Sequence, residues 1–448
     1  MIDQTTAIPE DKTVPKQSLP SSAYTANRAF LRDLFAKAVS FAAPENTLHL
    51  HLPPPPKHGK TFIVAAGKAA ASMARAFERA WPMDAPLSGV ALTRDGHGVS
   101  CDRVTVIEAA HPVPDDRGYE AAQDILKSCE ALTADDLMVC LISGGGSSLL
   151  ALPAPGIPLP DKKEMNRQLL ACGAPIGAMN VVRKHVSAIK GGRLAVAAYP
   201  ARTVTLALSD VPGDDLATIA SGPAVPDEST CHDALGIIER YGLQLPASIL
   251  DHLKSDHAET PKSDHPALQN IETAMVFTPS QMIEQVAAEL DAADVIVHNL
   301  GANIEGEASA VANDHAAMVR TIKQAGKQAG MQKPHIILSG GETTVTLDKT
   351  AQKSSTEKKA KGRGGRNCEY LLALTCALKG IDGVTAMAAD TDGIDGSEDN
   401  AGAIMDSQTL ARTEALGLNA TQMLAGHDSY TFFDQLGDLI KTGPTRTN

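Results

Sequence analysis

The chain has 448 residues, about two or three domains' worth, and 43% of them are hydrophobic while 21% are charged. This composition is typical of a globular protein, and no apolar run is long enough to span a membrane. The net charge of −13 and the 3% aromatic content argue against nucleic-acid binding as the main task. An acidic protein that handles anionic ligands must gather cations locally, and we expect no membrane or nucleic-acid partner.

The first residues and the cysteines bear on the compartment. Residues 1–22 are polar and interrupted by prolines, so we expect a disordered tail and not a signal peptide. The seven cysteines are scattered, without the spacing of a disulfide framework or a zinc site. A cytoplasmic protein fits both observations best.

The first half of the chain alternates strands with helices. Apolar residues at helical spacing predict a helix over residues 25–42, and residues 61–80 have the pattern of a strand, a turn and a helix. Short apolar strands are expected at 104–107, 137–142 and 204–208. This alternation predicts a parallel sheet covered by helices on both faces.

A second α/β region follows a polar stretch. Residues 255–270 contain two prolines, and we expect a domain boundary there, between domains at 23–254 and 271–448. In the second domain a helix is expected near 281–293, and the expected strands lie near 295–298, 335–338 and 384–388. The low-complexity basic stretch 351–361 predicts a solvated loop.

Four glycine-rich loops each follow an expected strand: AAGKAA (65–70), SGGGSS (143–148), SGGETT (339–344) and ADTDGIDG (389–396). In open parallel sheets, ligands bind outside the carboxyl ends of the strands, and glycine lets backbone N–H groups approach an anion closely. A tight turn is the alternative for any single loop, but four loops on one rim favour phosphate binding. The residues expected at phosphate are Gly144, Gly145, Gly146, Ser147, Ser148, Gly340 and Gly341.

Basic residues lie near these loops. Lys68 sits at a strand-to-helix turn, where its ammonium can act on a transferring phosphoryl group. The segment MNVVRKHVSAIKGGRLA concentrates cations that include Arg183 and Lys190, although one solvated helix face would explain much of it. In GRGGRN, Arg363 and Arg366 have guanidinium groups that suit carboxylate or phosphate, and a flexible basic turn is the alternative.

Carboxylates gather after the last expected strand. Asp390, Asp392 and Asp395 lie within six residues, and hard oxygen ligands at a strand end suit Mg2+ beside a nucleotide. The spacing is not that of an EF-hand, and a hydrated Asp-Gly turn is the alternative. The segment LSDVPGDD adds Asp210, Asp214 and Asp215, one of which could instead cap a helix.

Several well-known signatures are missing. The sequence has no G-x-x-x-x-G-K-[ST] and no clean G-x-G-x-x-G after a strand, which disfavours a Walker-type kinase and a conventional nicotinamide dehydrogenase. Ser147 does not lie in a G-x-S-x-G elbow. For His111, which precedes a proline in HPVPDDRG, we favour a structural role over that of a base.

Taken together, these motifs resemble one family. From residue 28 to the end, the chain is similar to the glycerate 2-kinases that carry a C-terminal MOFRL domain, some of which formerly bore the name hydroxypyruvate reductase. The resemblance rests on AAGKAA, HPVPDDRG, ISGGGSSLLALP, MNVVRKHVSAIKGGRLA, LSDVPGDDLATIASGP, IEGEA, LSGGETTVT, GRGGRNCE and ADTDGIDG, which follow the family's order.

The resemblance implies ATP-dependent phosphorylation of D-glycerate at its 2-hydroxyl, with Mg2+ or Mn2+ as the metal. It also implies a two-domain α/β fold, in which a larger Rossmann-like domain and a smaller MOFRL-type domain enclose the active site. Lys68 matches the family's catalytic lysine, and Arg366 is favoured over Arg363 as the matching arginine. Asp390 is expected to be catalytic or, with Asp392, to hold the metal.

The remaining expectations concern the substrate and the alternatives. Arg183, Lys190 and Arg363 are expected to bind the substrate, and a homodimer is left open. An NAD(P)H-dependent hydroxypyruvate reductase and a non-catalytic nucleotide or anion sensor remain alternatives. Two departures from the family are a longer connection at 348–361, expected to be mobile, and the ending TGPTRTN. There Arg446 replaces the usual glycine and the family's final short strand is missing.

Overall fold

The computed structural model describes residues 22–209, 213–269, 271–291, 293–329, 333–347 and 362–447. Residues 1–21 of the expected tail, Asp210 and the expected mobile connection at 348–361 lie outside the described residues. Ser22 begins the first helix. Among the described residues, none of the helices combines the length and apolar character that a bilayer span requires.

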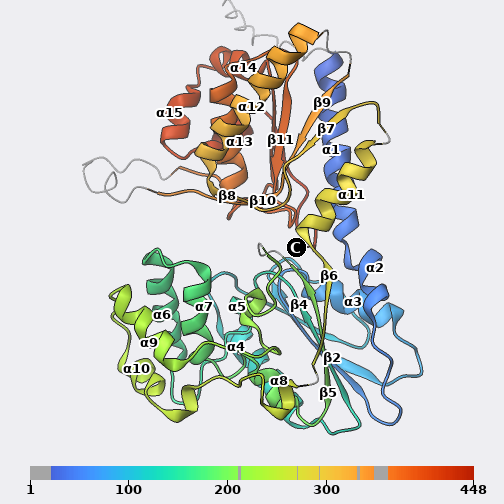
Figure 1. Ribbon diagram of the computed structural model, residues 1–448, viewed down its shortest axis with the longest axis vertical. Helices are drawn as coiled ribbons and strands as arrows, with labels where there is room; N and C mark the ends of the chain where they lie inside the picture. The colour runs from blue at the N-terminus through green and yellow to red at the C-terminus, as the bar shows by residue number, and fades with distance from the viewer. Residues whose placement is uncertain are drawn as a thin grey trace, which may run out of the picture.

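Six parallel strands form the larger sheet, in the order β3-β2-β1-β4-β5-β6 (Figure 1). They are β1 (Thr61–Ala66), β2 (Leu87–Arg94), β3 (Thr105–Ala109), β4 (Leu137–Ile142), β5 (Arg202–Leu208) and β6 (Glu272–Phe277). This is the strand order of doubly wound dinucleotide-binding folds, and the order reverses between β1 and β4. The expected parallel sheet is therefore confirmed.

Alternate residues of the strands enter two separate cores, as a sheet buried on both faces requires. On one face Val64 and Cys140 pack under helices α4 (Asp116–Glu130) and α8 (Arg193–Ala198). On the other face Ile63 packs with helix α3 (Ala70–Ala80). A third core joins four further helices at one side, namely α6 (Leu159–Ala171), α7 (Ile176–His185), α9 (Cys231–Arg240) and α10 (Ala247–Leu253).

The described residues of the C-terminal region form three small sheets. Two are parallel pairs, β7 (Ile296–Asn299) with β9 (His335–Leu338) and β8 (Ile304–Glu307) with β10 (Gly341–Thr344). The third is antiparallel and joins β11 (Thr385–Ala389), β12 (Gly402–Asp406) and β13 (Leu439–Ile440). The helices of the C-terminal region are α11 (Pro279–Asp291), α12 (Ala308–Ala329), α13 (Arg366–Leu378), α14 (Thr409–Ala415), α15 (Ala420–Ala425) and α16 (Ser429–Gln435).

Two elements link the upper and lower parts of the molecule in Figure 1. Helix α1 (Ser22–Ala42) lies beside α11 and β11 in the C-terminal part, and α2 (Pro44–Thr47) returns the chain to the larger sheet. Strand β6 is the sixth strand of the larger sheet although it follows the polar stretch 255–270. The chain therefore crosses between the two parts after α1 and again after β6.

Candidate active site

The loops after β1 and β4 are joined at the point where the strand order reverses. Lys68 N donates to Gly144 O at 2.8 Å, and Ala69 N donates to Ser143 Oγ at 3.0 Å. Gly67 has a φ of 133°, and a Cβ there would lie 2.2 Å from Ser143 Oγ. Only glycine therefore permits this approach, which fixes where Lys68 begins its side chain.

A cavity of about 920 Å³ runs through the C-terminal part, lined chiefly by α1, α11, α12, α13 and strands β9 and β11, and it reaches the larger sheet at Lys68, Leu208 and Phe277. Gly340, Gly341, Arg366 and Asp390 also line it. The sequence led us to expect the four glycine loops on one rim, and the structure does not place them on one rim. Two follow strands of the larger sheet and two follow β9 and β11, so they meet across a cleft.

Two ion pairs bring the predicted charged residues together in this cleft. Lys68 Nζ donates to Asp392 Oδ2 at 2.5 Å, which joins the larger sheet to the loop after β11. Arg366 is the first residue of α13. Its Nη2 donates to Asp390 Oδ2 at 2.9 Å, and its Nη1 donates to Glu342 Oε1. The two aspartates are adjacent and each pairs with one cation, so the cluster has both signs of charge available for a charged ligand.

The two aspartates titrate differently. Burial and the neighbouring charge of Asp392 raise the pKa of Asp390 to about 6. Burial also acts to raise the pKa of Asp392, but the charge and hydrogen bond of Lys68 hold it below its ordinary value. The pair therefore offers one carboxylate that stays ionised and one suited to general-base work near neutral pH.

Two histidines lie beside Lys68, namely His111, for which the sequence favours a structural role, and His97, which no motif singles out. A Cβ on Gly145 would lie 2.9 Å from His111 Nε2 and 3.4 Å from Lys68 Cγ, so the three residues are in contact. Burial and the charge of Lys68 lower the pKa of His111 to about 4. His97 is fully buried, and its Nδ1 lies 3.2 Å from Lys68 O. A lone histidine before a turn carries no spacing signal that would have identified either one.

The third aspartate of the ADTDGIDG loop has a structural role. Asp395 Oδ1 accepts from Asn367 N at 2.9 Å, and Asp395 Oδ2 accepts from Cys368 N at 2.8 Å. These are amides in the first turn of α13, so Asp395 fixes the start of the helix that carries Arg366. The same residue also leaves no room for a Cβ on Gly365, at 2.3 Å from Asp395 Oδ1.

The end of the chain closes over the same loop. Thr445 N donates to Asp392 O at 3.0 Å, and Thr445 Oγ1 donates to Thr391 O at 2.5 Å. Ser72 Oγ, in α3, donates to Arg446 O at 2.5 Å. Arg446 has a φ of 60°, a backbone conformation that glycine adopts most easily, at the position where the resembling family has glycine.

The SGGGSS loop is held from behind by a buried lysine. Lys190, 1% exposed, donates to Ser147 O and at 2.8 Å to Ser147 Oγ, and burial lowers its pKa far below the ordinary value. Ser147 Oγ lies 2.8 Å from Ser221 Oγ, which donates to Asn180 Oδ1 at 3.2 Å. Within the loop, the amides of Gly146 and Ser148 donate to carbonyls of their own turn.

The other predicted cationic residues contact neighbouring side chains outside the cavity. Arg183 donates to Asn166 Oδ1 at 3.2 Å and to Asn180 Oδ1 at 3.3 Å. Arg363 is exposed, pairs with Glu398 at 2.5 Å and lies 4.1 Å over the Tyr430 ring. Among the described residues, the cavity lining does not include Arg183, Arg363, Lys190 or the SGGGSS loop.

Gly341 and the aspartates of LSDVPGDD also have local roles. Gly341 lies in β10, where a Cβ would be 2.0 Å from Ile304 O of β8, so strand pairing requires glycine there. Asp215 accepts hydrogen bonds from Ala217 N and from Thr218 Oγ1 within its own turn. Asp214 lines the cavity.

The chain matches two family models and several known proteins. The Domain of unknown function (DUF4147) matches residues 30–254, and the MOFRL family matches residues 335–448. A protein of Agrobacterium vitis, provisionally named a hydroxypyruvate reductase, is 47% identical over 421 residues, which cover 94% of this chain and 92% of that protein. The D-glycerate 2-kinase of Thermotoga maritima is 36% identical over 390 residues, covering 87% and 88%.

A solved structure agrees with these matches. The crystal structure of glycerate kinase from Thermotoga maritima superimposes with a TM-score of 0.80 at 34% identity, covering 95% of this chain and 97% of that one. Fold and matches thus define an α/β enzyme that contains a doubly wound parallel sheet and a MOFRL domain. The chain belongs to the glycerate kinase family, as the sequence motifs led us to expect.

Proposed function

We propose that the protein transfers the γ-phosphoryl group of ATP to the 2-hydroxyl of D-glycerate, giving 2-phospho-D-glycerate and ADP. The observation that carries the proposal is the cluster in which Lys68 and Arg366 flank the adjacent carboxylates of Asp392 and Asp390. The names of the Thermotoga maritima relatives agree with this activity.

Phosphoryl transfer asks a protein mainly to position the reactants and neutralise charge. Lys68 and Arg366 both line the cavity, and each pairs with an aspartate of the loop after β11, so we assign them to the transferring phosphoryl group. Asp390 lies between Arg366 and Asp392, and we assign it to accept the proton of the 2-hydroxyl. Closing two charged loops around the group would also exclude water, which competes with glycerate as the acceptor.

The carboxylates of Asp390 and Asp392 fit a magnesium ion chemically, because both offer hard oxygen donors within one loop. Lys68 and Arg366 now occupy one oxygen of each carboxylate, and both cations could turn toward phosphate when a metal arrives. We propose that Asp392 would hold the ion, and that Asp390 would join it as a ligand only in the alternative in which it does not serve as the base. When bound, Mg2+ would neutralise charge on the ATP phosphates.

The glycine loops complete the proposed ATP site. Gly340 and Gly341 line the cavity directly, and the SGGGSS loop adjoins it because Gly145 packs on Lys68. Lys190 is buried behind that loop, so we assign it to holding Ser147 in place and not to the substrate's carboxylate. Arg366 then remains as the guanidinium best placed to orient the acid.

A reductase remains the second candidate because of the name of the Agrobacterium vitis relative. The order of the six strands is also that of dinucleotide-binding folds. The turn after β1 reads AAGKAA, however, and not G-x-G-x-x-G. It therefore lacks the glycines that let the backbone of a nicotinamide fingerprint approach the cofactor's pyrophosphate. Oxidation of NADH by hydroxypyruvate without ATP, at a rate comparable with kinase turnover, would establish the reductase.

Phosphorus NMR of a reaction with ATP, Mg2+ and D-glycerate tests the proposal. A 2-phosphoglycerate signal is the expected result and identifies both the reaction and the hydroxyl. A 3-phosphoglycerate signal would retain the kinase but overturn the assignment of the 2-hydroxyl as the acceptor. ATP binding without any phosphoester would contradict the proposal and favour a sensor.

A further inference from the structure

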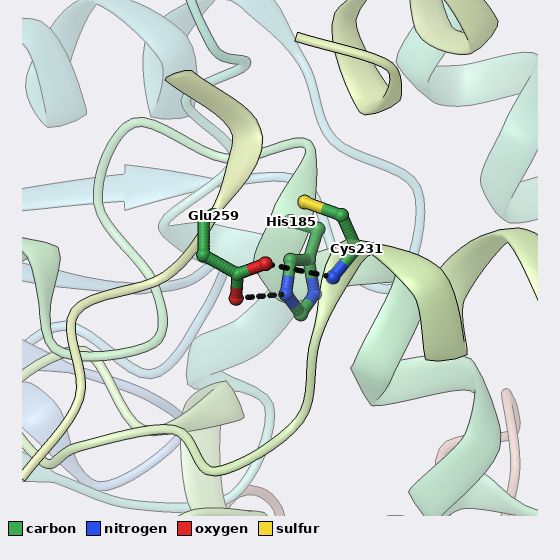
Figure 2. A group of neighbouring side chains, drawn as sticks. All are labelled: His185, Cys231 and Glu259. Atoms are coloured by element: carbon green, nitrogen blue, oxygen red, sulfur yellow. Dashed lines mark hydrogen bonds and ion pairs between the residues drawn. The ribbon is translucent and has the colours of Figure 1, made fainter. Parts of the chain in front are cut away.

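Three side chains outside the proposed active site converge between separate segments. His185 ends α7, Cys231 begins α9, and Glu259 follows α10, as Figure 2 shows. One potential ligand atom from each residue lies within 4.8 Å of the other two. The set combines nitrogen, sulfur and oxygen donors, and the proposed kinase chemistry uses none of them.

The hydrogen bonds of His185 orient it as metal-ligating histidines are oriented. Its Nδ1 lies 2.8 Å from Val181 O, and because a carbonyl only accepts, Nδ1 must donate. In the neutral ring, Nε2 therefore carries the lone pair, and it faces Glu259 Oε1 at 3.4 Å. Two acceptors placed face to face are stabilised by a cation that both contact. A backbone carbonyl on the second ring nitrogen is the usual support of such a ligand.

We propose that His185, Cys231 and Glu259 form a binding site for a zinc-like transition metal ion. Thiolate and imidazole donors favour zinc over magnesium or calcium, and a fourth position would be left to water. Tetrahedral zinc bonds place ligand atoms about 3.3 to 3.8 Å apart, so the three side chains need to contract only slightly. On binding, the Cys231 thiol would release its proton to solvent.

Lys262 is the group that a metal would have to displace. Its Nζ lies 2.6 Å from Glu259 Oε1, but it also contacts Asp227 O at 2.9 Å, Thr260 Oγ1 at 2.9 Å and Ser229 O. An ammonium group has three donors, and these three acceptors satisfy them without Glu259. The carboxylate can therefore turn to a metal while Lys262 stays fully hydrogen-bonded.

The metal would join the end of α7 to the start of α9 and to the segment after α10. These helices share one hydrophobic core with α6, so the expected effect is higher stability of this helical group. The site touches neither Lys68 nor Arg366, so failure of the kinase proposal would not affect it.

Cobalt titration tests the site, because a thiolate ligand gives Co2+ a near-ultraviolet charge-transfer band that oxygen ligands do not. We expect chelator-treated, untagged full-length protein to develop this band with one equivalent of Co2+, and Zn2+ to abolish it. Cys231→Ser should lose the band, and Cys172→Ser, which changes another half-buried thiol of the same core, should keep it.

Two further results keep the test decisive. Glu259→Gln should keep the band but bind Co2+ at least about tenfold more weakly, because an amide oxygen lacks the carboxylate's charge. Zn2+ should raise the thermal midpoint of wild type and not that of Cys231→Ser. No band with excess Co2+ in the folded wild type, or a band that survives in Cys231→Ser, would overturn the proposal.

Discussion

Arg363 and Arg366 lie in the same short motif but have different surroundings. Arg363 rests on the Tyr430 ring and pairs with Glu398 at the surface, with its side chain 55% exposed. Arg366 lines the cavity, and burial, which acts against its charge, is outweighed by Asp390 and Glu342, which raise its pKa. The sequence does not separate the two arginines clearly, because both lie among glycines in GRGGRN and either guanidinium could bind phosphate.

Replacing each arginine by alanine separates their roles. Arg366→Ala should lower kcat about 100- to 1000-fold, because a cation beside the transferring group contributes about 3 to 4 kcal/mol to the transition state. Arg363→Ala should stay within about threefold of wild type, because surface ion pairs contribute little. Steady-state kinetics with D-glycerate and ATP, with circular dichroism as a folding control, would decide it. Equal losses in the two variants would contradict the assignment.

The residues of the cleft were predictable to different degrees. Lys68, Asp390 and Asp392 follow strands in glycine-rich loops, and that pattern is visible in the sequence. His111 and His97 gave no such signal, because single histidines show their proximity to Lys68 only after folding. The cluster of His185, Cys231 and Glu259 is equally invisible, since its members are separated by tens of residues with no metal-ligand spacing.

At the scale of elements, helix α6 contains a buried lysine that no functional proposal uses. Lys162 is 2% exposed, and its Nζ donates to Leu152 O at 3.0 Å. Burial, and to a smaller degree the charge of Arg183, lowers its pKa from 10.5 to about 7. The native helix therefore favours the neutral amine, whereas the unfolded chain has a lysine with its ordinary pKa.

Between about pH 7 and pH 10.5 the unfolded state consequently binds more protons, so the free energy of unfolding rises with pH. The slope from this group is at most about 1.4 kcal/mol per pH unit. Lys162→Met should remove it, whereas Lys163→Met, which changes the neighbouring lysine, should keep the wild-type slope. Urea unfolding at about pH 7.5 and about pH 9 measures the difference. Parallel pH profiles for all three proteins would contradict the prediction.

Element boundaries were predicted best where an apolar strand is followed by a glycine-rich loop. Strands β4 and β9 match the expected ranges 137–142 and 335–338, because apolar runs end abruptly at SGGGSS and SGGETT. Strands β8 and β10 were missed, because IEGE and GETT are polar and their pairing depends on partners far away in the sequence. The sheet order that brings β1 beside β4 is likewise a tertiary property.

At the scale of the whole molecule, α1 ties the start of the described chain to its C-terminal part. Arg28 pairs with Asp406 and with Asp438 at 2.7 Å each, and both carboxylates are almost fully buried. The sequence predicted the helix from its apolar spacing but placed it in residues 23–254, because periodicity identifies a buried face and not its partner. Helix α1 precedes the larger sheet in the sequence but packs on the C-terminal part. Strand β6 lies in residues 271–448 but belongs to the larger sheet.

Arg28→Ala tests how much this link contributes. The change would leave Asp406 without its buried cation, while Asp438 keeps Arg412 at 2.6 Å, so the expected loss is about 3 kcal/mol. Arg32→Ala, which alters an exposed residue of the same helix, should stay close to wild type. Thermal unfolding followed by circular dichroism would show the difference in midpoint.

The single tryptophan allows unfolding of the larger sheet to be followed separately from unfolding of the whole molecule. Trp81 is buried in the core of the larger sheet, so its fluorescence reports that part of the molecule, whereas circular dichroism reports all helices. Because Arg28 contacts the C-terminal part, Arg28→Ala should move the dichroism transition to a lower temperature than the Trp81 transition. Arg28→Ala with midpoints like those of Arg32→Ala by both probes would show that α1 does not hold the two parts together.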